Sequence, residues 1–313
     1  MQNRAPQMQD WPLPKVRGKY VHDVALADLC WFRVGGTADV VFMPADAQDL
    51  SHFLSELPQE VPLHILAAGS NTLVRDGGVR GVVIRLGAAF GQVEPASETQ
   101  LWAGAASLDV KLARAAADSS LSGLEFYRGI PGAIGGAIAM NAGAYGGETS
   151  DVLVEVEGVD RAGQLQVFSP ADLQLSYRHN GHTDFIVYTR ARFAATPGDK
   201  KTILAAMDEI SAKREETQPI KSRTGGSTFK NPGGANPQGP KAWKLIDAAG
   251  ARGLRVGDAQ MSELHCNFMI NHGQASAADL ETLGEQVRTL VAKTSGETLH
   301  WEIKRIGDRG AGA

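Results

Sequence analysis

Residues 128–148 read RGIPGAIGGAIAMNAGAYGGE. Seven of its 21 residues are glycine, five are alanine, and no charged residue lies between its two ends. Glycine allows backbone N–H groups to approach a ligand where a Cβ atom would collide. Successive free N–H groups and a helix N-terminus together bind phosphate. The composition therefore suits a backbone cradle for a phosphate-bearing ligand.

The same stretch predicts a short helix. Pro131 suits the first helical position. One apolar face follows at helical spacing, formed by Ile130, Ile134 and Ile138. This face is expected to pack on the core, and the backbone is expected to stay open at three glycines, Gly132, Gly135 and Gly136.

Two other interpretations of the stretch were weighed. Close packing of helices through small residues explains the same composition, and this alternative stays open on the stretch alone. A membrane span does not fit, because glycine and alanine bury little apolar area and Asn141 lies near the middle.

Another loop of small and polar residues follows an apolar run at residues 63–66. In chain order it is the first of the two phosphate loops, and the glycine stretch is the second. It reads AAGSNTLVRDGG (67–78) and offers Gly69, Ser70 and Asn71 as backbone and side-chain donors. Neither loop matches the dinucleotide fingerprint or the Walker loop. Two phosphate loops of another kind predict a large cofactor that carries phosphate.

The composition is that of a globular protein of two or three domains. Of 313 residues, 43% are hydrophobic and 21% charged, with a net charge of −4. This charge argues against general binding to nucleic acid or to an anionic membrane. Cys30 and Cys266 cannot form a disulfide framework, and no secretory signal is seen, so we expect reduced thiols and a cytoplasmic protein.

Hydrophobic periodicity predicts a mixed α+β chain. The expected strands are 38–42, 63–69, 82–86, 99–103, a hairpin within 153–168, 185–193 and 299–307. The expected helices are 46–57, 107–120, 201–216, 241–250 and 275–293. In the helix at 107–120, the inward residues are expected to be Leu108, Leu112, Ala115 and Ala116. The helix at 201–216 is expected to mark a domain boundary.

Seven motifs in order resemble one enzyme family. They are FRVGGTAD (32–39), AAGSNTLVRDGG (67–78), SGLEFYRGIPGAIGGAIAMNAGAYGGE (122–148), SYRHN (176–180), GGSTFKNP (225–232), SELHCNFMINHG (262–273) and LHWEIKRIG (299–307). Together they resemble the UDP-N-acetylenolpyruvoylglucosamine reductases, in the shorter subtype (type II). The resemblance covers nearly the whole chain, from about Phe32 to Gly307.

This resemblance implies a fold and a division into domains. The fold is a two-lobed FAD-binding domain of the PCMH/vanillyl-alcohol-oxidase type, followed by a C-terminal α+β substrate-binding domain. The expected boundaries are an N-terminal extension at 1–31, the first lobe at 32–95, the second lobe at 96–200, the substrate-binding domain at 201–307 and a tail at 308–313.

The resemblance also implies an activity. The chain is expected to be a cytoplasmic flavoprotein oxidoreductase that uses NADPH to reduce UDP-N-acetylglucosamine enolpyruvate to UDP-N-acetylmuramate. This step belongs to peptidoglycan precursor synthesis, and so to cell wall biogenesis, cell shape and cell division. FAD is expected to bind without a covalent link, because no His or Cys lies in either phosphate loop. A UDP-sugar is the expected partner of a monomer that binds neither nucleic acid nor membrane.

The family's site positions map onto this chain residue by residue. The resemblance implies three catalytic residues: Arg178 to bind the substrate carboxylate, Ser227 to donate a proton and Glu302 to orient or polarise the carboxylate. It implies three substrate-binding residues, Tyr177, Lys230 and Asn231. The residues implied for FAD are Gly69, Ser70, Asn71, Leu73, Gly129, Ile130, Pro131, Gly132, Gly135, Gly136, Asn141 and Gly143.

Two details limit the assignment. Asn180 stands where the family usually has Ser or Cys, which leaves the hydrogen bonding beside Arg178 open. His179 and His182 lie three residues apart without a third ligand, so no metal site is expected.

Two alternatives were considered. One is an FAD-dependent oxidase of the same superfamily, acting on a sugar or hydroxy acid. It is expected to share the phosphate loops but to lack GGSTFKNP and the terminal glutamate. The other is a flavin- or nucleotide-binding regulatory module, which has no need of all three catalytic positions.

Overall fold

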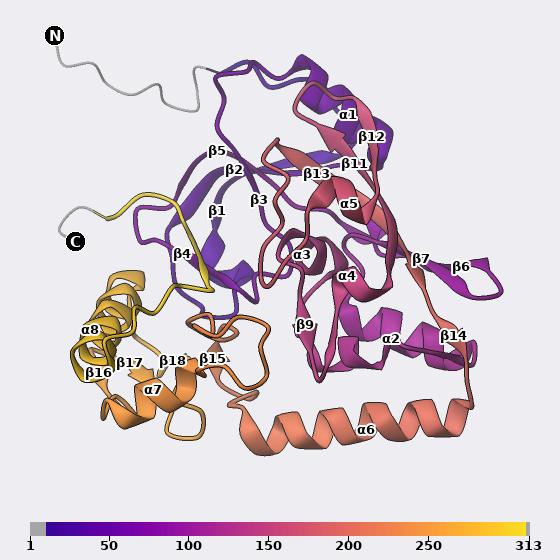
Figure 1. Ribbon diagram of the computed structural model, residues 1–313. Coiled ribbons are helices and arrows are strands. Elements are labelled where there is room, and N and C mark those ends of the chain that lie inside the picture. Colours follow the sequence, from indigo (N-terminus) through magenta and orange to yellow (C-terminus); the bar gives the residue numbers. More distant parts are fainter. Residues whose placement is uncertain (1–10, 311–313) are drawn as a thin grey trace, which may run out of the picture.

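The computed structural model describes residues 11–310, in which three groups of elements follow one another along the chain (Figure 1). The first group contains a four-stranded sheet in the order β1-β2-β5-β3. β1 is antiparallel to β2, whereas β2 and β3 are both parallel to β5. The elements of this group are β1 (Lys19–Ala25), η2 (Leu26–Leu29), β2 (Thr37–Met43), α1 (Ala47–Glu56), β3 (Leu63–Ile65), β4 (Thr72–Val74), β5 (Val79–Ile84) and η3 (Ala88–Phe90).

The expected β-α-β unit is confirmed, with β5 inserted between its two strands. α1 begins after Asp46, whose side chain accepts a hydrogen bond from the backbone N–H of Asp49 at 2.9 Å. The helix buries Leu50, Phe53 and Leu54 against the sheet. The first loop therefore emerges from a well-packed unit at the end of β3.

The second group is built on a five-stranded antiparallel sheet in the order β12-β11-β13-β7-β6. Its strands are β6 (Val93–Ser97), β7 (Gln100–Gly104), β8 (Leu121–Ser122), β9 (Gly143–Ala144), β10 (Gly147–Glu148), β11 (Leu153–Asp160), β12 (Leu165–Phe168), β13 (Ile186–Ala194) and β14 (Thr196–Pro197). Its helices are α2 (Asp109–Asp118), η4 (Glu125–Gly129), α3 (Ile134–Ala139), α4 (Thr149–Val152), α5 (Pro170–Leu173) and α6 (Lys200–Thr217). The hairpin expected within 153–168 is confirmed, and Gly163 takes a positive φ of 81° in its turn.

The third group forms a smaller four-stranded sheet in the order β15-β18-β17-β16, packed on two helices. Its elements are β15 (Arg223–Thr224), α7 (Ala242–Ala248), β16 (Arg255–Val256), β17 (Ala259–Met261), β18 (Met269–Asn271), α8 (Ala277–Ser295) and β19 (Lys304–Ile306). Ser276 begins α8 with a reciprocal capping box to Asp279. β19 leaves this group and pairs in parallel with β4 of the first group. The last strand therefore joins the C-terminal segment to the first group.

The helix within the glycine stretch is shorter than expected. It begins at Ile134 rather than Pro131, because the preceding backbone is extended: Leu108 and Ala133 form an antiparallel bridge. Ile134 and Ile138 are fully buried as predicted, whereas Ile130 lies before the helix and is only partly buried.

The expected inward face of the helix at 107–120 needs two corrections. Leu108 is 53% exposed, because it precedes α2 and its extended backbone turns it outward. The next residue, Asp109, takes the inward position and is fully buried. Ala115 is only partly buried, and the buried apolar face is instead formed by Leu112, Ala113, Ala116 and Ala117.

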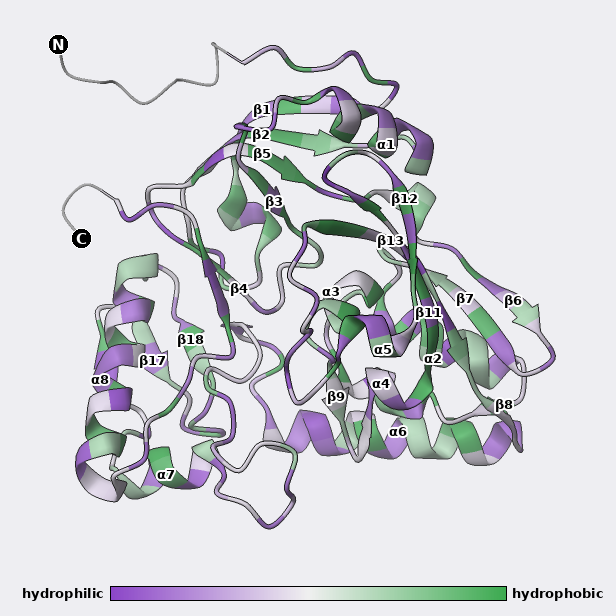
Figure 2. Ribbon diagram, turned by 45° about the horizontal axis from the view of Figure 1, so that its top comes forward, coloured by the Kyte–Doolittle hydropathy of each residue, from purple (hydrophilic) through white to green (hydrophobic). Residues whose placement is uncertain are grey.

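α6 runs along one side of the molecule from the second group to the third (Figure 1). Its buried residues, Ile203 and Met207, belong to the hydrophobic core of the second group. The hydrophobic core of the third group, here called the third core, also contains Phe32, Val34 and Leu73 of the first group. Strong hydrophobic colour falls on β2, β5 and β13, whereas α6 and α8 carry many polar residues (Figure 2). Within residues 11–310, no helix is long and apolar enough to cross a membrane.

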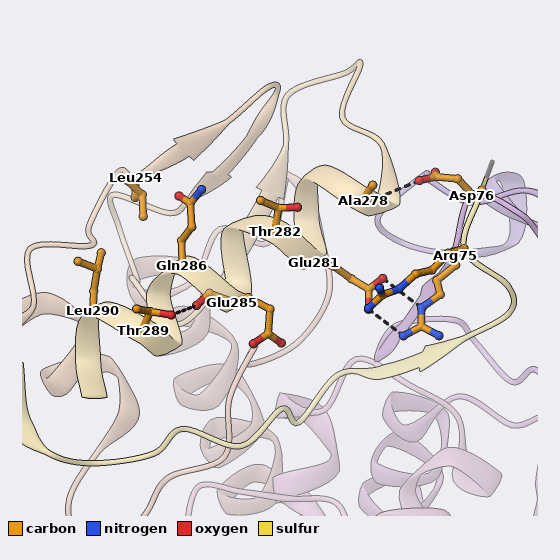
Figure 3. Close-up of a pocket in the computed structure, with 12 residues that line it drawn as sticks. Arg75, Asp76, Leu254, Ala278, Glu281, Thr282, Glu285, Gln286, Thr289 and Leu290 are labelled. Carbon is orange, nitrogen blue, oxygen red and sulfur yellow. Dashed lines mark hydrogen bonds and ion pairs between the residues drawn. The ribbon is translucent and has the colours of Figure 1, made fainter. Parts of the chain in front are cut away.

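A pocket along α8 shows how the third group is fastened to the first (Figure 3). Arg75 donates two hydrogen bonds to Glu281, each at 3.0 Å, and Arg305 contacts the same carboxylate at 3.2 Å. Asp76 accepts from the backbone N–H groups of Ala277 and Ala278 at the start of α8. Because these polar groups pair with one another, the pocket is better explained as a structural junction than as a binding site.

Candidate active site

A second cavity draws its lining from all three groups of elements. It encloses about 1140 Å³ when its open mouth is included. The lining is drawn from residues within the segments 67–72, 129–144, 214–220 and 224–227, with Trp31, Asp109, Arg178, Phe268 and Glu302 as single residues. Both predicted phosphate loops and all three predicted catalytic residues therefore lie on one cavity.

The first phosphate loop is held by backbone geometry and by contacts to the C-terminal segment. Gly69 has a φ of 65°, and a Cβ atom there would collide with the carbonyl oxygen of Leu29. The carbonyl of Ser70 accepts a hydrogen bond from the N–H of Gly226 at 3.1 Å. Asn71 Nδ2 donates to the carbonyl oxygen of Glu302 at 3.1 Å. The loop thus connects the strand that precedes it to the segments that carry Ser227 and Glu302.

The glycines of the long stretch do not share one role. A Cβ atom on Gly136 would meet only Ala67 Cβ within 4 Å, at 3.9 Å, and Gly136 lines the cavity. A Cβ atom on Gly132 would lie 2.8 Å from Asp109 Oδ2. Gly135 instead faces Ala105, whose Cβ would be 3.2 Å from an added Cβ, and it is absent from the cavity lining. The two interpretations of the glycine stretch, an open backbone cradle and close packing, therefore apply to neighbouring residues. Gly136 leaves backbone open, and Gly135 permits close packing.

Arg178 is presented by a tight turn between α5 and β13. Ser176 and His179 exchange two backbone hydrogen bonds of 3.0 Å, and Arg178 has a φ of 51°, which non-glycine residues seldom adopt. Its Nη2 donates to the carbonyl of Gly143 at 2.6 Å, and its Nε donates to Glu302 Oε1 at 3.1 Å. The guanidinium is therefore fixed against the glycine stretch on one side and the C-terminal segment on the other.

Ser227 and Glu302 are brought together by backbone pairing. The N–H of Glu302 donates to the carbonyl of Thr228 at 2.9 Å, and the N–H of Lys230 donates to the carbonyl of His300 at 2.8 Å. Ser227 is partly buried and lines the cavity. Glu302 alternates with Trp301 and Ile303, a strand pattern that by itself predicts an outward side chain, but the side chain of Glu302 is only 10% exposed.

Burial raises the pKa of Glu302 above its ordinary value, although Arg178 and Lys230 act in the opposite direction. The raised pKa favours the protonated carboxyl group to a higher pH than usual. A neutral acid beside Arg178 can donate a hydrogen bond to a bound carboxylate, which an ionised group cannot do.

Six of the expected site residues lie outside the cavity lining: Leu73, Gly135, Asn141, Tyr177, Lys230 and Asn231. The side chain of Leu73 is buried in the third core, because β4 pairs with β19 there. Asn141 is fully buried and ties the glycine stretch to the Arg178 turn, donating to the carbonyl of Ser176 at 3.1 Å.

The three expected substrate-binding residues support the catalytic loops. Lys230 Nζ donates to the carbonyl of Arg178 at 3.1 Å, and the hydroxyl of Tyr177 accepts from the N–H of Asn231 at 3.3 Å. Asn231 Oδ1 accepts from the N–H of Ala242 at the start of α7. These contacts join the Arg178 turn to the Ser227 loop.

Asn180 also has a clear structural role. Its Nδ2 donates to the carbonyl of Ile138 at 3.3 Å and to the hydroxyl of Tyr188 at 2.9 Å, and its Oδ1 accepts from the N–H of His182. Asn180 therefore anchors the Arg178 turn to α3 and does not line the cavity.

Several cavity residues were missed by the sequence reasoning. They include Trp31, Asp109, Arg214, Gln218 and Phe268. Arg214 lies near the end of a helix with few buried apolar residues, where a cation gives no local sign of a site. Asp109 was overlooked because helical spacing predicted that its neighbour, Leu108, would turn inward.

The residues present fit an FAD molecule. The cavity passes from the first loop across the glycine stretch to Arg178, and backbone is open to it at Gly136. Within residues 11–310, both carboxyl oxygens of Asp109 are buried and have no protein partner. A two-lobed α+β fold with such a cradle defines the class of flavin-binding oxidoreductases.

The comparisons with known proteins name the family. Residues 38–169 match the model of the FAD binding domain, and residues 218–306 match that of the UDP-N-acetylenolpyruvoylglucosamine reductase C-terminal domain. Reductases of this name from Parvibaculum lavamentivorans and Methylorubrum extorquens are 58% and 56% identical, over 95% and 94% of this chain and 94% of each relative. The chain belongs to the UDP-N-acetylenolpyruvoylglucosamine reductase family and is an FAD-dependent oxidoreductase.

Solved structures agree with this assignment. The UDP-N-acetylenolpyruvylglucosamine reductase from Thermus caldophilus is similar with a TM-score of 0.78 and 35% identity, covering 93% of this chain and 99% of that one. The 6-hydroxy-D-nicotine oxidase from Arthrobacter nicotinovorans shares the fold, with a TM-score of 0.57 over 93% of this chain and 89% of that one. At 10% identity, this likeness concerns the fold alone.

Proposed function

We propose that this enzyme uses NADPH to reduce the enolpyruvyl group of UDP-N-acetylglucosamine enolpyruvate, giving UDP-N-acetylmuramate. The observation that carries the proposal is the convergence of Arg178, Ser227 and Glu302 on one cavity that also contains both phosphate loops. The three residues come from segments far apart in the sequence, so the fold brings them together and not their spacing along the chain. We further propose that the enzyme acts as a monomer in the cytoplasm.

When bound, FAD would supply hydride chemistry at the terminal carbon of the enolpyruvyl double bond, with NADPH as the source of the electrons. The electron pair of that bond then moves toward the carboxylate, which gains enolate character. Arg178 is suited to stabilise this charge, because its guanidinium is permanently cationic and can bind both carboxylate oxygens. The bonds that hold Arg178 to the Gly143 carbonyl and to Glu302 keep it in place before the substrate binds.

Ser227 is proposed to donate a proton to the carbon next to the carboxylate. A serine hydroxyl is a weak acid, but an enolate carbon is strongly basic, so the transfer is reasonable. The Ser227 loop is held against residues 300–302 by backbone hydrogen bonds, which limits the positions open to the hydroxyl.

Glu302 is proposed to act in its neutral form. A protonated carboxyl group beside Arg178 can donate a hydrogen bond to the substrate carboxylate and so strengthen its polarisation. The raised pKa of Glu302, caused by burial, supports this protonation state.

The loops around Gly69 and Gly132 are proposed to hold the diphosphate of FAD through their backbone N–H groups. Tyr177, Lys230 and Asn231 are proposed to serve the UDP portion of the substrate, although each already supports a catalytic loop. A substrate contact at these residues therefore also affects the position of Arg178.

The oxidase alternative is tested with the reductase in one experiment. The purified flavoprotein is titrated with NADPH without oxygen, and the enolpyruvyl UDP-sugar is then added while the flavin absorbance is followed. Loss of the yellow colour followed by its return on adding the sugar is the expected result. Colour that returns only with oxygen identifies an oxidase and overturns the proposal.

A further inference from the structure

The carboxyl group of Asp109 is a feature that the proposed chemistry leaves unused. Asp109 begins α2 and is fully buried, yet it lines the cavity of the catalytic residues. Within the described part of the chain, neither of its oxygens has a hydrogen-bond partner. A buried polar group without a partner is costly, so the group is expected to gain one when the cavity is filled.

The position of this carboxyl group indicates which part of a ligand it meets. A Cβ atom placed on Gly132 would lie 2.8 Å from Asp109 Oδ2 and 3.6 Å from the hydroxyl oxygen of Ser70. The N–H of Asp109 also donates to the carbonyl of Gly132 at 3.2 Å. Asp109 thus lies where the two phosphate loops meet.

No cation neutralises this carboxyl group among residues 11–310: no ion pair involves it, and burial is the cause of its raised pKa. On its own helix, Lys111 donates to the carbonyl of Gly91, and Arg114 pairs with Asp118. The elements packed on α2 carry further charged or titratable groups: Glu94, Glu125, Tyr127, Arg128, Lys200, Lys201, Asp208, Glu209, Lys213, Arg214, Glu215 and Glu216. Of these, Lys200 pairs with Asp118, and the cavity wall adds Arg178 and Glu302. The pKa of Tyr127 is raised mainly by burial and in part by Asp109.

An ionised carboxylate at this place would repel a diphosphate, whereas a neutral carboxylic acid can donate a hydrogen bond to it. We propose that Asp109 is a cofactor-binding residue that donates a hydrogen bond, as a neutral acid, to a phosphate oxygen of FAD. This inference rests on the proposed placement of the FAD diphosphate at the two loops. It makes FAD affinity depend on pH through one identified proton.

The test measures the dissociation constant of FAD by flavin fluorescence on flavin-free enzyme, from about pH 6 to about pH 9.5. Wild type is expected to bind FAD more weakly as the pH rises and Asp109 ionises. Asp109→Asn keeps a neutral donor, so it is expected to bind as wild type does at low pH and to lose much less affinity at high pH. Asp109→Ala is expected to bind about tenfold or more weakly even at low pH.

Asp118→Asn is the matched control, because Asp118 lies on the same helix at the surface. It should follow the wild-type curve. Equal binding by wild type and Asp109→Ala overturns the inference, as does an Asp109→Asn curve parallel to that of wild type. If Asp109→Ala fails to fold, the comparison of Asp109→Asn with wild type still decides. Absence of FAD binding by wild type contradicts the proposed function instead.

Discussion

The side chains proposed to carry the chemistry meet through contacts that span long distances in the sequence. Arg178 and Glu302 are 124 residues apart, yet their side chains meet at 3.1 Å and are 19% and 10% exposed. A hydrogen bond from a guanidinium to a carboxyl oxygen this buried is stronger than one at the surface, because water screens and competes with it less. Neither residue is distinctive alone, but together they form one side of the cavity.

Replacing Ser227 tests the proton donor directly. Ser227→Ala should leave reduction of the flavin by NADPH unchanged and lower turnover by about 10²–10⁴-fold, the usual contribution of general acid catalysis. Stopped-flow absorbance separates the two half-reactions. Ser222→Ala, at an exposed position of the same segment, should behave as wild type. Normal turnover by Ser227→Ala excludes the proposed role.

The protonation state of Glu302 predicts a pH dependence. A raised pKa keeps the proton on the carboxyl group to a higher pH, so the active neutral form is lost as the pH rises through that pKa. The rate at which substrate reoxidises the reduced flavin should therefore fall on the alkaline side. Glu302→Gln cannot ionise and should show a lower but flatter profile; the same alkaline fall in this variant would assign the titration to another group.

At the scale of single elements, neighbouring residues of the glycine stretch have different structural roles. Gly136 faces open space in the cavity, and Gly135 faces Ala105 of the segment that leads into α2. A helix turns by about 100° per residue, so adjacent glycines point in different directions. One short helix can therefore pack closely on one side and expose backbone on another.

Substitution of Gly136 should separate these roles. Gly136→Ala places a methyl group in ordinary contact, 3.9 Å from Ala67, and should retain FAD. Gly136→Val projects further into the cavity and should purify with much less FAD while its far-UV circular dichroism stays native. The flavin-to-protein absorbance ratio measures the outcome. Full flavin content in the valine variant would contradict a backbone cradle at this position.

On the scale of the whole molecule, the C-terminal segment depends on the first lobe. Its core includes Phe32, Val34 and Leu73, and β19 pairs with β4. The buried residues of α6 pack in the second lobe, so we propose that the substrate-binding domain begins after this helix rather than at residue 201. The same arrangement brings Glu302 beside the first phosphate loop.

Because of this shared core, residues 218–307 expressed alone should not fold cooperatively. Loss of three buried apolar side chains and of the pairing partner of β19 removes more stability than a unit of this size can spare. Thermal unfolding followed by circular dichroism should show a sharp transition for the full chain and none for the fragment. A cooperative transition in the fragment would show that the segment is an independent domain.

Elements with strong local signals were predictable, and positions set by distant contacts were not. The helices expected at 46–57 and 275–293 are present and are capped by Asp46 and Ser276, because a cap needs only the next three residues. Leu108 was wrongly expected to turn inward, because the bridge to Ala133 starts α2 one residue after it and leaves it on the extended segment. The roles of Asn141 and Asn180 depend on hydrogen bonds to distant segments, for which no sequence spacing gives a sign.

The sequence by itself determined the family, and it predicted the two phosphate loops and the proposed roles of Arg178, Ser227 and Glu302, because these depend on residue type and order. Only the tertiary structure decided which glycine faces the cavity, that Glu302 turns inward and that Asp109 is buried at the junction of the loops. The physical reason is that backbone propensity depends on near neighbours, whereas burial and electrostatic environment depend on segments that folding brings together.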